Sequence, residues 1–183
     1  MCAKKTYTNK DPFARPKHLP STMRPLFETV TDLDQHADAV CARRYGVVEI
    51  VDGRFVRLRL RPLPKLITLR EIVPVGPRYH LRGPADRCLL YYNQPRQFPN
   101  FLAVKYVIST HRTRPVTVFG ALAVLDAIAR IKQTDALVCD VANSRISDRL
   151  LRRWGWESHK PQRWHRNFIK RFYGEYPQVV LPL

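Results

Sequence analysis

The chain has 183 residues, enough for one domain of ordinary size, and 45% of them are apolar, which excludes a wholly disordered protein. Its 32 lysines and arginines stand against 15 acidic residues, a formal charge of +17 that suits an anionic partner or serves solubility alone. The four cysteines are scattered without a Cys-x-x-Cys pair, which argues against a zinc site.

The first 25 residues are basic and rich in proline, so we expect an extended tail at 1–25 and a single domain over 26–183. Met1–Lys10 lacks the apolar core of a secretory signal, and no apolar run reaches the roughly 18 residues of a membrane helix. We therefore expect a reduced, cytoplasmic protein without a membrane partner.

The first predicted helix covers Thr31–Tyr45. Thr31 is placed to cap it, acidic residues occupy its first turn, and two arginines occupy its last turn. Gly46 follows and is predicted to end the helix.

A β-hairpin is predicted next, with strands at Val47–Val51 and Phe55–Arg61 around the turn Asp52-Gly53. In its second strand, three apolar residues alternate with three arginines: Val56, Leu58 and Leu60 against Arg57, Arg59 and Arg61. The apolar residues are expected to face the core. The arginines are either a solvated outer face or a ladder that binds phosphates.

Three strands and one long helix follow. Leu66–Val75 is a possible strand in a proline-rich stretch, while Cys88–Tyr92 and Phe101–Thr110 are predicted strands, the latter central in a sheet. Thr117–Gln133 is apolar nearly all round, so we expect a helix buried against that sheet. Ala136–Val141 is a further short apolar strand, with Cys139 as a small core residue.

The C-terminal part is predicted to contain a basic helix and two final strands. The helix covers Ser144–Trp154, with apolar residues on one face and Asp148 one turn before Arg152 as an ion pair. The strands are placed at Trp156–His159 and Asn167–Tyr173.

This order of elements over about 101–176, with Asn143 and Ser147 opening a short helix that ends at Gly155-Trp156, resembles the GCN5-related N-acetyltransferases. The resemblance implies an α+β, GNAT-like (acyl-CoA N-acyltransferase) fold, with a mixed, mostly antiparallel sheet flanked by helices. It implies an acetyl-CoA-dependent N-acetyltransferase that transfers acetyl to an amine of unknown identity, without a metal.

In that family the coenzyme lies between two diverging strands, here Phe101–Thr110 and Ala136–Val141. Its pyrophosphate lies at the N-terminus of the long helix, where unpaired N–H groups and the helix dipole favour an anion. The residues that the resemblance brings to acetyl-CoA are Arg112, Arg114 and Thr117 near the pyrophosphate, and Asn143 and Ser147 near the pantetheine arm. The family's tyrosine is replaced by Leu151, so no general acid or base is named.

The alternative hypothesis is a non-catalytic basic protein that binds nucleic acid or a ribonucleoprotein on the same fold. It is motivated by the charge and by a phosphate loop with a proline, Pro115, and a single late glycine, Gly120. Residues 159–177 mix basic and aromatic side chains, which suits either a nucleic-acid surface or a hairpin with its aromatic row in the core. His159 and His165 fit no metal site and are interpreted as solvated.

Overall fold

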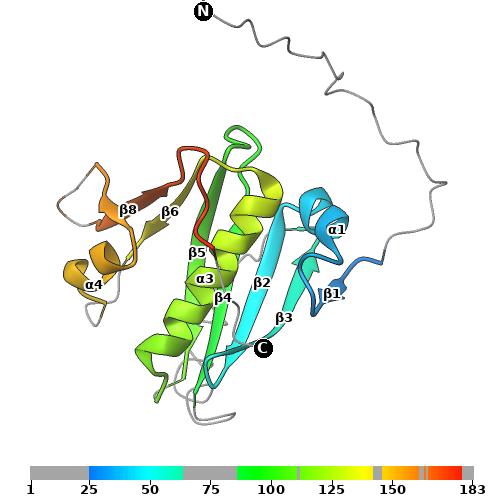
Figure 1. Ribbon diagram of the computed structural model, residues 1–183, viewed down its shortest axis with the longest axis horizontal. Coiled ribbons are helices and arrows are strands. Elements are labelled where there is room, and N and C mark those ends of the chain that lie inside the picture. The colour runs from blue at the N-terminus through cyan, green and yellow to red at the C-terminus, as the bar shows by residue number, and fades with distance from the viewer. Residues whose placement is uncertain are drawn as a thin grey trace, which may run out of the picture.

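The computed structural model describes residues 25–63, 86–110, 112–141, 146–160, 163 and 165–178. These residues form an eight-stranded sheet with helices against it (Figure 1). In chain order the elements are β1 (Glu28–Val30), α1 (Ala37–Ala42), β2 (Tyr45–Val51), β3 (Arg54–Arg61), β4 (Arg87–Asn93), β5 (Phe101–Ser109), α3 (Pro115–Lys132), β6 (Ala136–Asp140), α4 (Asp148–Arg153), β7 (Glu157–Ser158) and β8 (Asn167–Arg171).

The sheet is mixed and mostly antiparallel, in the order β1-β3-β2-β4-β5-β6-β8-β7. Only β5 and β6 run parallel among the described strands, and α3 is the crossover between them. A parallel pair requires such a crossover, whereas antiparallel neighbours can be joined by tight turns. The predicted fold class, an α+β domain with a mostly antiparallel sheet flanked by helices, is confirmed.

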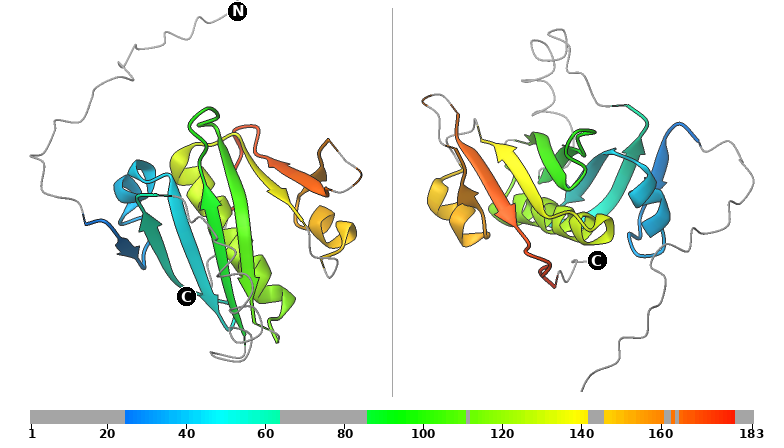
Figure 2. Two further views of the ribbon diagram at one scale, coloured as in Figure 1. Left: turned by 180° about the vertical axis from the view of Figure 1, so that it is seen from behind. Right: turned by 90° about the horizontal axis from the view of Figure 1, so that it is seen from above.

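The core lies between one face of the sheet and α3, with α1 packed beside α3 on the same side (Figure 2). Residues Ala121, Leu125 and Ile128 of α3 are fully buried and belong to the same core cluster as Val48 and Leu90 of the sheet. The nearly all-apolar sequence of this helix is therefore explained by burial, as predicted. No helix in the described part of the chain is long and apolar enough to cross a membrane.

The β2–β3 hairpin is confirmed. Asp52 and Gly53 have φ angles of 51° and 78°, the left-handed pair that a two-residue hairpin turn with the right twist needs. The register then shifts by one residue, so Val56 has no partner in β2 and is 41% exposed, while Phe55 packs against the core. The prediction that Val56 faces the core is wrong because this bulge reverses the alternation.

The predicted helix at Thr31–Tyr45 is wrong over most of its length. It is reduced to α1, and the turn before α1 is held by Asp32, whose carboxylate accepts the backbone N–H groups of Asp34 and Gln35. The strand β1, which the sequence did not reveal, precedes it and pairs with β3. Local helix signals are outweighed here by pairing with distant strands.

Gly46 is not the end of a helix but a member of β2. A Cβ atom at this position would lie 2.6 Å from Cε1 of the Tyr92 ring, so only glycine allows the ring to cross β2. The Tyr92 ring is itself buried and cannot move aside without disturbing the core.

The other predicted strands at Cys88–Tyr92, Phe101–Thr110 and Ala136–Val141 agree with β4, β5 and β6 within one residue at each end. The long helix begins two residues early, at Pro115, because proline is well suited to the first helical position. Several predictions lie outside the described residues, namely the tail up to residue 24, the possible strand at Leu66–Val75 and the start of the helix at Ser144. The domain limits stay a prediction.

At the C-terminal end, α4 and β7 are shorter than predicted. The aromatic side chains of β8 and of the residue after it pack in the core. Phe168 and Phe172 are buried, which confirms the core interpretation for these two rings, whereas Tyr173 is exposed. The predicted pair of Asp148 with Arg152 is wrong: Asp148 instead binds Arg166, which precedes β8 and ties α4 to it.

Candidate active site

A cleft opens where β5 and β6 part. The two strands pair from Phe101 with Ala136 to Val104 with Cys139, and β5 then continues to Ser109 against β4 alone. Beyond Val104, the edge of β5 that faces β6 is left without a strand partner in the described structure. Alternate residues of this segment therefore direct backbone N–H and C=O groups towards the cleft.

A β-bulge marks the point of divergence. Tyr91 and Tyr92 of β4 face Tyr106 and Val104 of β5, so Lys105 is an extra residue without an opposite partner. A bulge bends its strand and increases its twist, which turns β5 away from β6. On the other side, β6 stays paired with β8 as far as Asp140.

The cleft has a volume of about 300 Å³ and is mostly apolar. Its walls are residues 104–108 of β5, Val118 and Leu122 of α3, residues 139–141 at the end of β6, and four side chains from the α4 region: Ile146, Leu151, Trp154 and Trp156. Burial of the Cys139 thiol raises its pKa to about 12, so this cysteine lines the cleft as a neutral, unreactive group.

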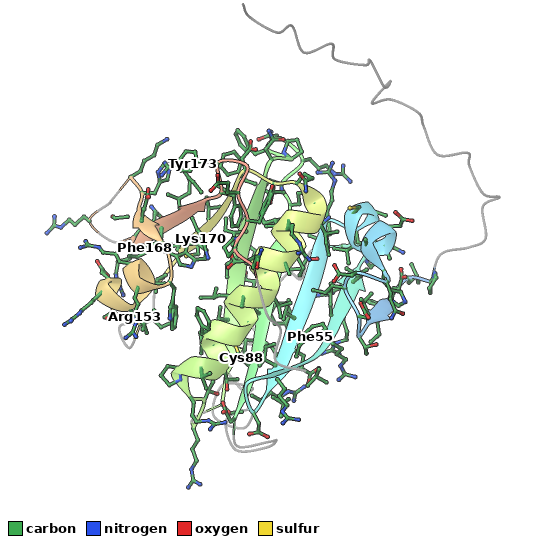
Figure 3. All side chains as sticks on the ribbon, in the orientation of Figure 1. Phe55, Cys88, Arg153, Phe168, Lys170 and Tyr173 are labelled. Carbon is green, nitrogen blue, oxygen red and sulfur yellow. The ribbon has the colours of Figure 1, made fainter. Side chains whose placement is uncertain are left out.

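A second hollow adjoins the cleft at the start of α3. It is lined by Pro115, Val116 and Phe119 of α3 together with Arg153 and Trp154 beside α4, and Leu150 completes it. The rings of Phe119 and Trp154 lie 5.5 Å apart between centroids, and Trp154 lines both hollows. Figure 3 shows Arg153 on α4, at the outer side of the molecule.

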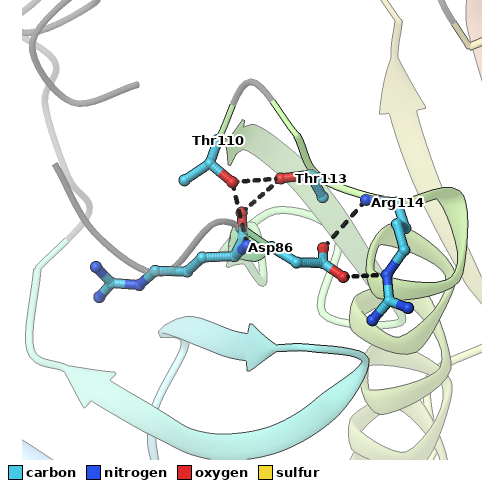
Figure 4. A network of polar contacts seen from close by, with 5 residues as sticks. Asp86, Thr110, Thr113 and Arg114 are labelled. Carbon is cyan, nitrogen blue, oxygen red and sulfur yellow. Dashed lines mark hydrogen bonds and ion pairs between the residues drawn. The ribbon is translucent and has the colours of Figure 1, made fainter. Parts of the chain in front are cut away.

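The N-terminus of α3 is capped by an acidic side chain from another element. The carboxylate of Asp86, which precedes β4, accepts the backbone N–H of Arg114 at 3.1 Å and its Nε–H at 2.6 Å (Figure 4). Thr110 and Thr113 brace the same turn through a hydroxyl contact of 2.8 Å. Arg114 thus donates two hydrogen bonds to Asp86. Its side chain is nevertheless 61% exposed, so the guanidinium can also contact an anion outside the protein.

The pKa of the Asp86 carboxyl reflects this arrangement. Burial by itself raises the pKa, but the hydrogen bonds and charge of Arg114 outweigh burial, and the net pKa is lower than the ordinary 3.8. The Thr117 hydroxyl also lowers it, although Thr117 Oγ1 is buried without a hydrogen bond of normal length and angle. The helix end is therefore already partly neutralised by a protein carboxylate.

The structure brings together part of the predicted site. Arg112 and Arg114 lie in the turn before α3, whereas Thr117 is fully buried in its first turn and faces the protein interior. Ser147 is exposed, and its hydroxyl accepts the backbone N–H of Leu150 at 3.2 Å, so it caps α4. The prediction for Asn143 falls outside the described residues.

A histidine–aspartate pair lies at the β6 side of the cleft and was missed from the sequence. His165 Nδ1 is 2.7 Å from Asp140 Oδ2, and both side chains are about half exposed, at 54% and 46%. Asp140 also lines the cleft. His165 precedes β8, whose pairing with β6 brings Asp140 and Asn167 opposite each other. The two partners are 25 positions apart in the sequence, and no local signal predicts this contact.

No protein-family model matches the chain, and no curated protein matches it. Among solved structures it is similar to nourseothricin acetyltransferase, with 13% sequence identity and a TM-score of 0.39 over 80% of this chain and 99% of that chain. A similarity of this size says nothing about activity. Among the described residues there is no cluster of three or more potential metal ligands.

Proposed function

We propose that the protein is an acetyl-CoA-dependent N-acetyltransferase that uses the cleft between β5 and β6. The observation that supports this proposal is the end of β5–β6 pairing at Val104 and Cys139, beside a mostly apolar cavity of about 300 Å³. A narrow cleft with one free strand edge suits an extended ligand that carries amides, because its amide groups can replace the missing strand.

The residues present fit such a ligand. The apolar walls from Val118, Leu122 and Trp154 would hold the pantetheine chain, and the β5 edge beyond Val104 would pair with its amides. Arg112, Arg114 and Arg153 surround the start of α3 with positive charge for the pyrophosphate. Because Asp86 already accepts the first available N–H, these side chains carry more of the phosphate affinity than the helix end does.

Among the other residues expected near the coenzyme, Ser147 begins α4 and would approach the pantetheine from that side, while Asn143 stays an expectation from the sequence. Ser147 can do so through its second lone pair, since its hydroxyl already caps the helix. Thr117 acts indirectly, by helping to lower the pKa of Asp86.

Bound acetyl-CoA would supply an activated acetyl thioester, and an ammonium acceptor must first give one proton to a base before its nitrogen attacks the thioester carbonyl. A second N–H proton then leaves with the departing sulfur as the CoA thiol, so the task for the protein is removal of the first proton. His165 is suited to this task because Asp140 accepts from Nδ1, which leaves Nε2 as the proton acceptor. Asp140 orients the ring and stabilises its protonated form. In this proposal His165 is the general base and Asp140 its positioning residue.

Isothermal titration with acetyl-CoA tests the proposal. Val107 lines the cleft and is 39% exposed, whereas Val56 is equally exposed, at 41%, in a strand away from the cleft. We expect Val107→Trp to weaken acetyl-CoA binding at least tenfold by filling the cleft, while Val56→Trp leaves it unchanged. Absence of binding heat at millimolar acetyl-CoA with folded wild-type protein, or equal affinity in the two tryptophan variants, would exclude this cleft as the coenzyme site.

A further inference from the structure

A separate pocket lies on the opposite face of the sheet from α3. It has a volume of about 260 Å³ and is lined by Phe27, Val47, Arg59, Arg61 and Tyr91. Successive residues of a strand point to opposite faces. Val48 belongs to the core with α3, so its neighbour Val47 faces away from that core.

Two arginines of this pocket are without a partner in the part of the chain that the structure describes. Arg59 and Arg61 form no hydrogen bond or ion pair in the described structure, and Arg59 buries its Nε–H without an acceptor. Their neighbour Arg57 is different, because Nε of Arg57 binds Glu49 at 2.7 Å. A half-buried guanidinium without a hydrogen-bond acceptor destabilises the fold, because its N–H groups have lost water. An acceptor on a bound ligand would remove this cost.

No acidic side chain among the described residues compensates these two charges. Glu49, on the same face, is shared between Arg57 and Arg87, and these two arginines hold its pKa below the ordinary value even though burial raises it. Glu28 lies opposite Leu60 in the sheet and so faces the other side. The pocket is therefore a site of concentrated positive charge.

Aromatic rings border the arginines. Phe27 is 63% exposed at the mouth of the pocket, and the Tyr91 ring meets the Tyr106 ring edge-to-face with centroids 6.4 Å apart. An exposed ring offers a face on which a planar base can stack, and an adjacent guanidinium binds the phosphate of the same nucleotide.

We infer that this pocket binds single-stranded nucleic acid, with phosphates at Arg59 and Arg61 and a base against Phe27. Rings next to unpaired arginines favour a nucleotide over a simple anion, and the formal charge of +17 favours a polyanion over a free nucleotide. A single strand is favoured over a duplex because only unpaired bases expose their faces to stack. This binding activity is separate from the proposed acetyl transfer.

Fluorescence anisotropy of the full chain with a labelled 12-nucleotide single strand, over a series of salt concentrations, tests the inference. We expect Arg59→Ala/Arg61→Ala to weaken binding at least tenfold and to reduce the log–log salt slope by about 1.4, since each phosphate contact to a single strand contributes about 0.7. The matched control is Arg149→Ala/Arg152→Ala, which removes two exposed arginines from the α4 segment and should have a much smaller effect.

A second variant separates stacking from charge and avoids the question of misfolding. Phe27→Ala removes an exposed ring, so the fold should persist by circular dichroism, while affinity falls about tenfold at an unchanged salt slope. Equal losses in the two arginine double variants, a duplex that binds as tightly as the single strand, or displacement of the strand by equimolar uridine monophosphate or polyglutamate would each overturn the inference. Acetyl-CoA titration of the same variants reports separately on the cleft.

Discussion

At the scale of single residues, the decisive contacts join side chains that are distant in sequence. His165 and Asp140 meet because β8 pairs with β6, and Gly46 is required because the Tyr92 ring crosses β2. Neither position carries a local pattern that reveals its role. The histidine looks like any solvated histidine, and the glycine looks like the end of a helix.

The proposed role of His165 leads to a prediction on catalysis. In an acetylation assay with an identified acceptor amine, His165→Gln should lower kcat about 100-fold, which is within the usual range for loss of a general base. The affinity for acetyl-CoA should stay unchanged. Asp140→Asn should give a smaller loss.

The control for this measurement is His159→Gln, the same substitution in the same connecting segment. His159 makes its contact to β8 through its backbone N–H, which donates to Asn167 at 2.8 Å, so the side-chain change should leave the rate intact. An unchanged kcat in His165→Gln would remove this residue from the mechanism.

At the scale of elements, α3 depends on a cap that comes from the lead-in to β4. Asp86 satisfies the backbone N–H of Arg114, so this contact joins the helix start to the middle of the sheet. The sequence before α3 offers no acidic side chain of its own, and the first turn contains none. The cap could therefore be found only from the folded structure.

The cap predicts a pH-dependent contribution to stability. The folded pKa of Asp86 lies below the ordinary 3.8, so its contribution is present above that pH and is lost as the pH falls through the lowered value. Asp86→Ala should reduce the free energy of unfolding by about 1 kcal/mol at pH 7, the usual cost of losing a cap. Urea unfolding from pH 7 to pH 3 should show the difference from wild type shrinking.

The control for Asp86 is Glu175→Ala, which removes an exposed acidic side chain. It should change stability by less than about 0.5 kcal/mol at every pH. A deficit in Asp86→Ala that stays constant down to pH 3 would show that the carboxylate charge does not support the helix.

At the scale of the whole molecule, the two parts of the sheet are joined only by the short pairing of β5 with β6 among the described strands. Four register pairs connect β5 to β6, and the cleft opens directly beyond them. Between these two parts, Lys170 of β8 binds Asp126 of α3 at 2.7 Å, with side chains only 14% and 8% exposed (Figure 3). This buried pair fastens the β6-β8-β7 part of the sheet to the helix that packs on the other strands.

Removal of one partner should loosen that part of the molecule. Lys170→Met leaves Asp126 buried without its cation, so we expect a loss of about 3 kcal/mol and faster hydrogen exchange in β6 and β8. Arg171→Met is the control on the same strand: its pair with Glu157 is more exposed, at 33% and 63%, and should contribute less than about 1 kcal/mol.

The double variant Lys170→Met/Asp126→Leu should recover much of the loss, because an apolar pair replaces the ion pair without leaving an isolated charge. If Lys170→Met were no more destabilising than Arg171→Met, the connection between the two parts of the sheet would not depend on this contact.

The sequence by itself determined the regular elements that follow from local periodicity and turn chemistry. Alternation predicted β3, apolar and β-branched runs predicted β5 and β6, the long apolar run predicted α3, and Asp52-Gly53 predicted the hairpin, because these signals depend on residues close together in the chain. The predicted helix at Thr31–Tyr45 failed because pairing of β2 with β3 and β4 outweighed its local helix signals.

Only the tertiary structure decided what surrounds the two candidate sites. The extra residue Lys105, the Asp86 cap, the His165–Asp140 pair and the unpaired Arg59 depend on which strands become neighbours and in which register. A shift of one residue reverses the face of every side chain in a strand, and neither the composition nor the period of the sequence records that shift.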